Sequence, residues 1–165
     1  IIKQIMADEQ RDDNDKIKLF EETTKKLEYK LNDESKIWNE RVKKLTCGLK
    51  DDIKRLIEVQ ADVISFNQIA SDEIRTYTLM LYKSNVNMKE LTKQRFEYYS
   101  TKYQLTIKND TTKKGLIESD LARIQYKNDL LEIHIHFLRD TCKDFESLNY
   151  AIKNRIELAN IYGID

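Results

Sequence analysis

The side chains most able to do chemistry in this chain are two histidines, His134 and His136, and two cysteines, Cys47 and Cys142. Two positions apart on a helix, the imidazoles differ in direction by about 200°, so they cannot bind one metal ion together. The cysteines fit no metal or redox spacing, and their wide separation argues against a disulfide. We therefore expect no metal centre and a reducing, cytoplasmic environment.

No other grouping of residues predicts catalysis or a cofactor. Gly48, Gly115 and Gly163 stand alone, so the sequence has no glycine-rich phosphate-binding loop. The paired acids Asp12-Asp13 and Asp51-Asp52 are typical of solvated helix faces rather than of general acid–base pairs. We expect neither enzymatic activity nor a bound cofactor.

The composition predicts a few very long helices. The 165 residues include no proline and only three glycines, the two residue types that interrupt helices. The 29 basic and 29 acidic residues cancel, which argues against nucleic-acid binding. A mean hydropathy of −0.69 and the acidic residues that follow Met6 predict neither a membrane span nor a signal peptide. Because the chain begins with Ile1, we expect it to be a piece of a longer protein.

Residues 108–115 (KNDTTKKG) combine helix-capping residues with a glycine and lack apolar residues, so we expect a hairpin turn there. After it, apolar residues recur at steps of four and three, which predicts a helix of about 45 residues packed along its length. This stripe is interrupted by Asn128 and Asn149 and otherwise consists of Ile117, Leu121, Ile124, Leu131, Ile135, Leu138, Cys142, Phe145, Ile152, Ile156 and Ala159. A second stripe predicts another neighbour, for which a second chain is a candidate, and comprises Tyr126, Leu130, Ile133 and Phe137.

Before that turn the same steps run from Leu49 to Leu105, and the positions that lack an apolar residue hold Gln60, Asn67, Ser84, Arg95 and Lys102. An upstream stripe comprises Ile17, Phe20, Leu27, Leu31, Trp38, Val42 and Leu45. The pattern crosses Gly48 without a phase change, so we favour one helix through Gly48 over a turn that would give three helices running up-down-up. The polar run Asp8–Lys16 is expected to be a loop or a frayed boundary, after a helix ending in Ile1–Met6.

A helix from Lys16 to Lys108 would be roughly 140 Å long, and one return helix would cover only half of it. The remaining apolar surface predicts dimerisation. The expected fold is therefore all-α: a single elongated, antiparallel, coiled-coil-like bundle of very long helices over residues 1–165, present as a homodimer.

Basic residues form several shallow patches suited to anionic lipid headgroups, where each cation contributes about 1 kcal/mol. The competing interpretation is an ordinary solvated surface, because acidic residues are interspersed. The candidate lipid contacts are Lys43, Lys50, Lys54, Lys93, Lys102, Lys113, Lys114, Arg123 and Lys127. Most aromatic residues at helical spacing, including Trp38, are expected in the core, and Tyr99 and Tyr103 are the best candidates for an exposed contact.

The stretch from Leu45 to Ser100 resembles a membrane-bending F-BAR domain of the BAR superfamily. In that family a helix carries apolar residues at steps that Leu45, Leu49, Ile53 and Leu56-Ile57 match, although proline is common where Leu56 stands. About forty residues later Lys93-Gln94-Arg95-Phe96 is similar to a family K-x-x-Y motif. Phe145 and Arg155-Ile156 are similar to a motif near the end of the family's domain.

The resemblance implies a crescent-shaped antiparallel homodimer that binds acidic phospholipids and senses or stabilises curvature at the periphery of cytoplasmic membranes. Its partners would be itself, the anionic membrane surface, and cytoskeletal or trafficking proteins, as in endocytosis. The alternative is a coiled-coil protein-assembly or tethering subunit with no lipid contact. Lipid binding predicts that the basic residues converge on one face, whereas protein assembly predicts scattered charges and an uncovered apolar groove.

Overall fold

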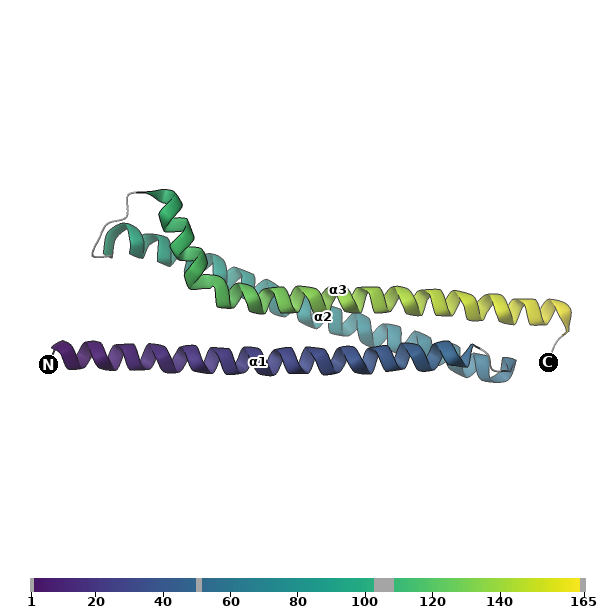
Figure 1. The fold of residues 1–165 in the computed structure, drawn as a ribbon. Coiled ribbons are helices and arrows are strands. Elements are labelled where there is room, and N and C mark those ends of the chain that lie inside the picture. Colours follow the sequence, from purple (N-terminus) through teal and green to yellow (C-terminus); the bar gives the residue numbers. More distant parts are fainter. Residues whose placement is uncertain (1, 50–51, 103–108, 164–165) are drawn as a thin grey trace. The chain divides into compact units, whose positions relative to one another are not determined.

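The computed structural model describes the backbone of residues 2–49, 52–102 and 109–163, and side chains over 17–49, 52–101 and 109–163. These residues form three α-helices, α1 (Ile2–Gly48), α2 (Ile53–Glu97) and α3 (Asp110–Tyr162), and a short π-helix, η1 (Tyr98–Lys102) (Figure 1). The prediction of an all-α fold is confirmed. The chain divides into two compact units, Ile1–Glu34 and Ser35–Asp165.

The first unit is helical from Ile2 onward, so the predicted loop or frayed boundary at Asp8–Lys16 is wrong. This run contains neither glycine nor proline, and its polar residues are therefore compatible with a solvated helix. Farther along, the hydroxyl of Thr24 donates to the carbonyl oxygen of Phe20 at 2.9 Å. Lys30 and Glu34 form an ion pair of 3.5 Å, one helical turn apart.

The chain turns after Gly48, so the favoured continuous helix is wrong and the three-helix alternative holds. Asp52 caps α2 because its carboxylate accepts a hydrogen bond from the backbone nitrogen of Arg55 at 2.9 Å. The expected helix of roughly 140 Å therefore does not exist. A dimer can no longer be inferred from a half-covered helix, and any argument for one has to rest on the exposed surface.

The helix predicted after the second turn is confirmed and longer than expected, at 53 residues. It begins at Asp110, because the Asn109 side chain caps it by accepting from the backbone nitrogen of Thr111 at 2.9 Å. Within the predicted turn at 108–115, Asp110–Gly115 are thus helical, and residue 108 lies outside the described residues. At the other end Gly163 adopts a left-handed conformation (φ 63°) and ends the helix.

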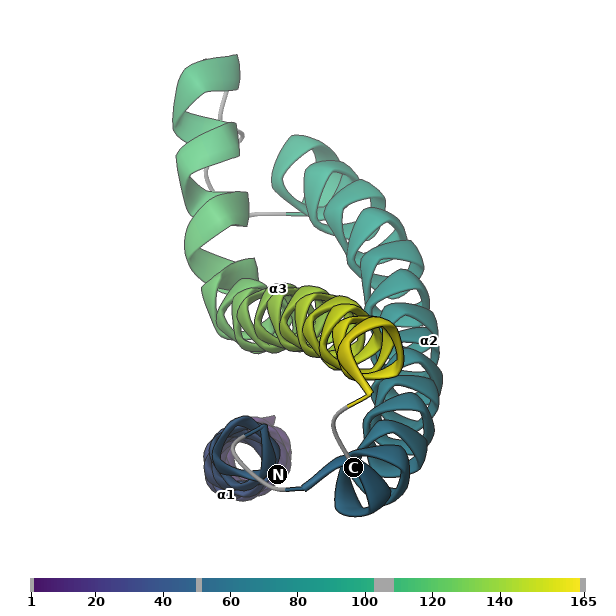
Figure 2. The same cartoon turned by 90° about the vertical axis from the view of Figure 1, so that its right-hand side faces the viewer.

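In the second unit α2 and α3 lie side by side and antiparallel (Figures 1 and 2). Their packed faces bury the apolar stripes found in the sequence, including Leu56, Val63, Leu131 and Leu138. The polar interruptions of the two stripes meet one another. The amide of Gln60 donates to the side-chain oxygen of Asn149 at 3.0 Å. The hydroxyl of Ser84 donates to the side-chain oxygen of Asn128 at 2.6 Å. Such matched polar pairs favour one register over its neighbours.

An aromatic cluster ties the end of α1 to α2 and α3. The Trp38 ring is 6.3 Å from that of Phe66 and 5.9 Å from that of Phe145, measured between centroids. Its indole nitrogen donates to Glu73 at 2.9 Å, and the guanidinium of Arg41 lies 4.5 Å from the ring centroid. Trp38 is therefore a core residue, as its helical spacing predicted.

Candidate functional site: a groove between α2 and α3

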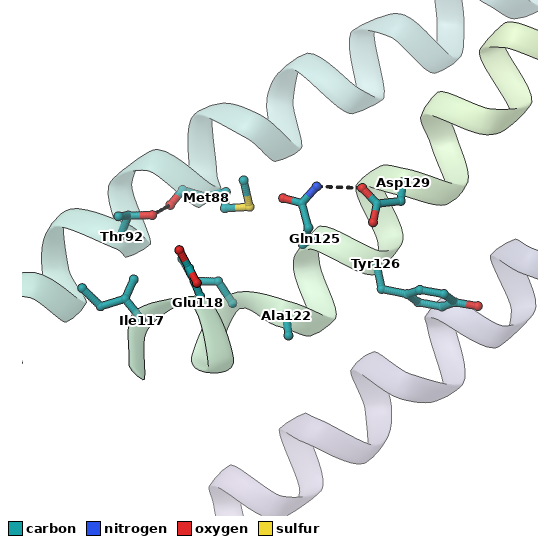
Figure 3. A pocket seen from close by; sticks show the side chains of 9 residues that line it. Met88, Thr92, Ile117, Glu118, Ala122, Gln125, Tyr126 and Asp129 are labelled. Atoms are coloured by element: carbon teal, nitrogen blue, oxygen red, sulfur yellow. Dashed lines mark hydrogen bonds between the residues drawn. The ribbon is translucent and has the colours of Figure 1, made fainter. Parts of the chain in front are cut away.

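A groove of about 420 Å³ opens between the last part of α2 and the first part of α3 (Figure 3). Helix α2 contributes Met88 and Thr92. Helix α3 contributes one face over three turns, consisting of Ile117, Glu118, Leu121, Ala122, Gln125, Tyr126 and Asp129. The apolar side chains on both sides give the groove a surface suited to another apolar side chain.

The floor of the groove belongs to a small core cluster formed by Tyr99, Ile117 and Leu121. Around this cluster pack the partly buried side chains of Met88, Leu91, Leu116 and Ile124. Ile117, Leu121 and Ile124 are members of the predicted α3 stripe, so the residues that hold the two helices together also form the floor. Such a surface is preorganised, which lowers the entropic cost of binding.

Polar residues along α3 give the groove an acidic rim. Figure 3 shows the Glu118 side chain pointing towards α2. The amide nitrogen of Gln125 donates to a carboxylate oxygen of Asp129 at 2.7 Å, which holds that side chain in place. The hydroxyl of Thr92 donates to the carbonyl oxygen of Met88 at 2.7 Å and is thereby engaged within its own helix. The groove therefore offers an apolar floor beside two carboxylates.

The end of α2 differs from expectation because of the π-helix η1. A π-helical turn holds more residues than an α-helical turn, so it changes the direction of the side chains within it. Tyr99 was expected to be exposed, but it is buried, and its hydroxyl donates to Asp120 at 2.8 Å. The same carboxylate oxygen lies 3.5 Å from Nε of Arg95. Tyr103 lies outside the described residues.

The basic residues proposed as lipid contacts do not gather in one place along the second unit. Lys43 and Lys54 are exposed near the turn after Gly48. About 39 residues of helix, or roughly 60 Å, separate Lys54 from Lys93 on α2. At that far end Lys114 and Arg123 are exposed and Lys127 is half-buried.

Lys113 is buried, which makes it a poor ligand for a headgroup. Its ammonium lies 3.3 Å from an Asp110 carboxylate oxygen and 5.1 Å from the centroid of the Phe96 ring. Lys50 and the side chain of Lys102 lie outside the described residues.

The two histidines take different environments, as their spacing predicted. His134 is buried, with its ring edge-on to that of Tyr77 at 4.9 Å, whereas His136 is exposed. Over the described parts of the chain, no three His, Cys, Asp or Glu side chains are placed to hold a metal ion. In the same residues no helix has the length and apolar character needed to cross a bilayer.

Cys142 and His136 line a second hollow, but the thiol is not activated there. Cys142 lies opposite Ser71 of α2, with 3.9 Å between the sulfur and the hydroxyl oxygen. Burial raises the pKa of the Cys142 thiol, and this effect outweighs that of the hydrogen bond between the thiol and the Ser71 hydroxyl, which lowers the pKa. The nearby Asp140 carboxylate is paired with Lys143 at 2.7 Å, and this hydrogen bond lowers the pKa of Asp140.

We expect Cys142 to react with a thiol-specific reagent more slowly than the exposed Cys47 at mildly alkaline pH, because Cys142 is partly buried and its raised pKa leaves less thiolate. The Cys47→Ser and Cys142→Ser variants isolate the two thiols for measurement with a chromogenic disulfide. Equal rates for the two variants, or a faster Cys142, would contradict the environment described here.

Comparison with known proteins yields no match: neither a protein-family model, nor a curated protein, nor a solved structure matches this chain.

Proposed function

We propose that this chain is a helical protein-assembly module that binds a basic amphipathic helix of a partner protein in the groove between α2 and α3. The observation that carries the proposal is the apolar floor of this groove beside the carboxylates of Glu118 and Asp129. A groove of this kind accepts the apolar face of a helix, and the acidic rim selects for lysine or arginine beside that face.

The dimensions of the groove suit a helix. Glu118 and Asp129 are eleven residues apart on α3, which corresponds to about 16 Å or three turns. A partner helix lying along α3 would present two or three apolar side chains to Met88 and Leu121, with a cation near each carboxylate. The small side chain of Ala122 leaves room for that approach.

The membrane-binding alternative has less support in this unit. Its cations lie at opposite ends of α2, and Lys113 is buried. The F-BAR resemblance and headgroup binding therefore stay predictions, which co-sedimentation with anionic liposomes at two salt concentrations would test.

The groove can be tested with a fluorescent helical peptide of about four turns, which carries leucines on one face and lysines at both ends of that face. We expect the peptide to bind, and the Ala122→Arg variant to raise its dissociation constant at least about tenfold by filling the groove and repelling lysine. Fluorescence anisotropy measures both.

Ala151→Arg is the matched control, because Ala151 is also exposed on α3 but lies outside the groove. A peptide with glutamates in place of the lysines should bind weakly to every variant. Equal binding of the lysine peptide to the wild type, Ala122→Arg and Ala151→Arg would refute the groove as its site.

A further inference from the structure

The outer face of α2 carries three large apolar side chains that the fold leaves uncovered. Leu79, Tyr82 and Val86 are 54%, 67% and 45% exposed, respectively. They are spaced three and four residues apart and therefore share one side of the helix. The opposite side of α2 carries the buried Ala70 and Tyr77, and it packs against α3, which lies beside α2 in Figure 2. An apolar stripe at this spacing is the usual contact surface between two helices.

The stripe has a charged residue beyond each end, an acidic one on the N-terminal side and a basic one on the C-terminal side. Asp72, Leu79, Val86 and Lys93 follow one another at intervals of seven residues, so they form a line along the helix in a left-handed coiled coil. Asp72 and Lys93 are both exposed. Within the described part of the chain, neither of these two side chains forms an ion pair. The line thus reads acidic, apolar, apolar, basic.

We propose that this face of α2 pairs antiparallel with the same face of a second copy of the chain. In that arrangement Asp72 lies opposite Lys93 of the second copy, and Leu79 lies opposite its Val86. Tyr82 lies beside the two-fold axis and faces its own counterpart. A parallel arrangement would place each charge opposite an identical charge, which is unfavourable. The self-complementary order of charges therefore selects both the partner and its direction.

Charge reversal tests the pairing of Asp72 with Lys93. The Asp72→Lys or Lys93→Asp variant places like charges opposite each other at both symmetry-related ends. We expect either variant to raise the dimer dissociation constant about tenfold in sedimentation equilibrium, since it replaces an attractive pair by a repulsive one at two symmetry-related positions. The doubly reversed variant, Asp72→Lys with Lys93→Asp, restores opposite charges and should dimerise like the wild type.

Lys153→Asp is a matched control on the exposed surface of α3 and should leave dimerisation unchanged. Circular dichroism verifies that each variant is folded. The proposal is overturned if the wild type sediments as a monomer at all concentrations, or if the double reversal is as weak as the single ones. Ala122→Arg should not alter dimerisation, so a failure of the groove and a failure of this surface are distinguishable.

Disulfide trapping tests the direction in a background with Cys47→Ser and Cys142→Ser. A chain with Leu79→Cys, mixed with a chain with Val86→Cys, should form a disulfide-linked dimer on mild oxidation. Such a mixed dimer still keeps one Leu79–Val86 contact. Neither chain should cross-link when it is oxidised alone, because antiparallel pairing places identical positions about 10 Å apart along the axis. Cross-linking of each chain with itself would indicate parallel pairing and overturn the proposal.

Discussion

Replacing Trp38 with alanine is expected to lower the free energy of unfolding by about 3–5 kcal/mol, the range for truncating a buried aromatic residue. The side chain is 1% exposed and contacts the rings of Phe66 and Phe145. The alanine variant would leave a cavity where α1, α2 and α3 meet. It would also remove the indole donor to Glu73 and the ring beneath Arg41. Urea unfolding followed by circular dichroism measures the change.

Two further variants separate packing from general effects of substitution. Trp38→Phe keeps much of the ring volume but loses the hydrogen bond to Glu73, so it should cost less than the alanine variant. Tyr150→Ala removes an aromatic side chain that is 68% exposed, and surface changes of this kind usually stay within about 0.5 kcal/mol. A loss below about 1 kcal/mol for Trp38→Ala would contradict its place in the core.

The sequence was sufficient to predict the helices whose apolar residues form one buried face. The α3 stripe from Ile117 to Ala159 is a helix, and Trp38 lies in the core. The start of α3 was misplaced because Asn109 and Asp110 can serve equally in a turn or at a helix N-terminus. Only the packing of the following turn decides between these two roles.

The break after Gly48 could not be read from periodicity. Trp38 and Leu45 on α1, and Leu56 on α2, are all buried in the second unit. When a chain turns back on the same core, the apolar stripes of both helices face that core. The phase can therefore be continuous across a turn, as it is here. The Asp52 cap was the local signal for the turn.

The groove and the outer face of α2 depend on exposure, which an apolar pattern alone does not reveal. Leu79 and Val86 have the same residue types as core positions, yet both are exposed. Tyr99 shows the converse, because the π-helical turn η1 brings it into the core. The groove arises where small Ala122 and polar Gln125 follow the buried Leu121 on α3, and only the neighbouring helix determines whether that space is filled.

Asn128 should determine register as well as stability. The side chain is 1% exposed, accepts from Ser84 at 2.6 Å and donates to Asn85 at 2.9 Å. Asn128→Ala would leave both partners without this amide in a partly buried site. We expect the free energy of unfolding to fall by about 2 kcal/mol, measured by urea unfolding. An unchanged stability would show that water replaces the amide without cost.

Replacing the polar pair with apolar residues, as in Asn128→Leu with Ser84→Ala, should not lower the free energy of unfolding in the way that Asn128→Ala does. Removal of both buried polar partners is often neutral or stabilising, but it also removes the penalty on a shifted register.

In a background with Cys47→Ser and Cys142→Ser, Gln60→Cys with Asn149→Cys reports the observed register, because these two side chains are in contact. Gln60→Cys with Ile156→Cys reports a shift by one heptad. With Asn128 and Ser84 intact only the first pair should cross-link, and with the apolar replacements the second pair should also do so. If the second pair never cross-links, the register is held by the apolar contacts of α2 and α3 rather than by Asn128.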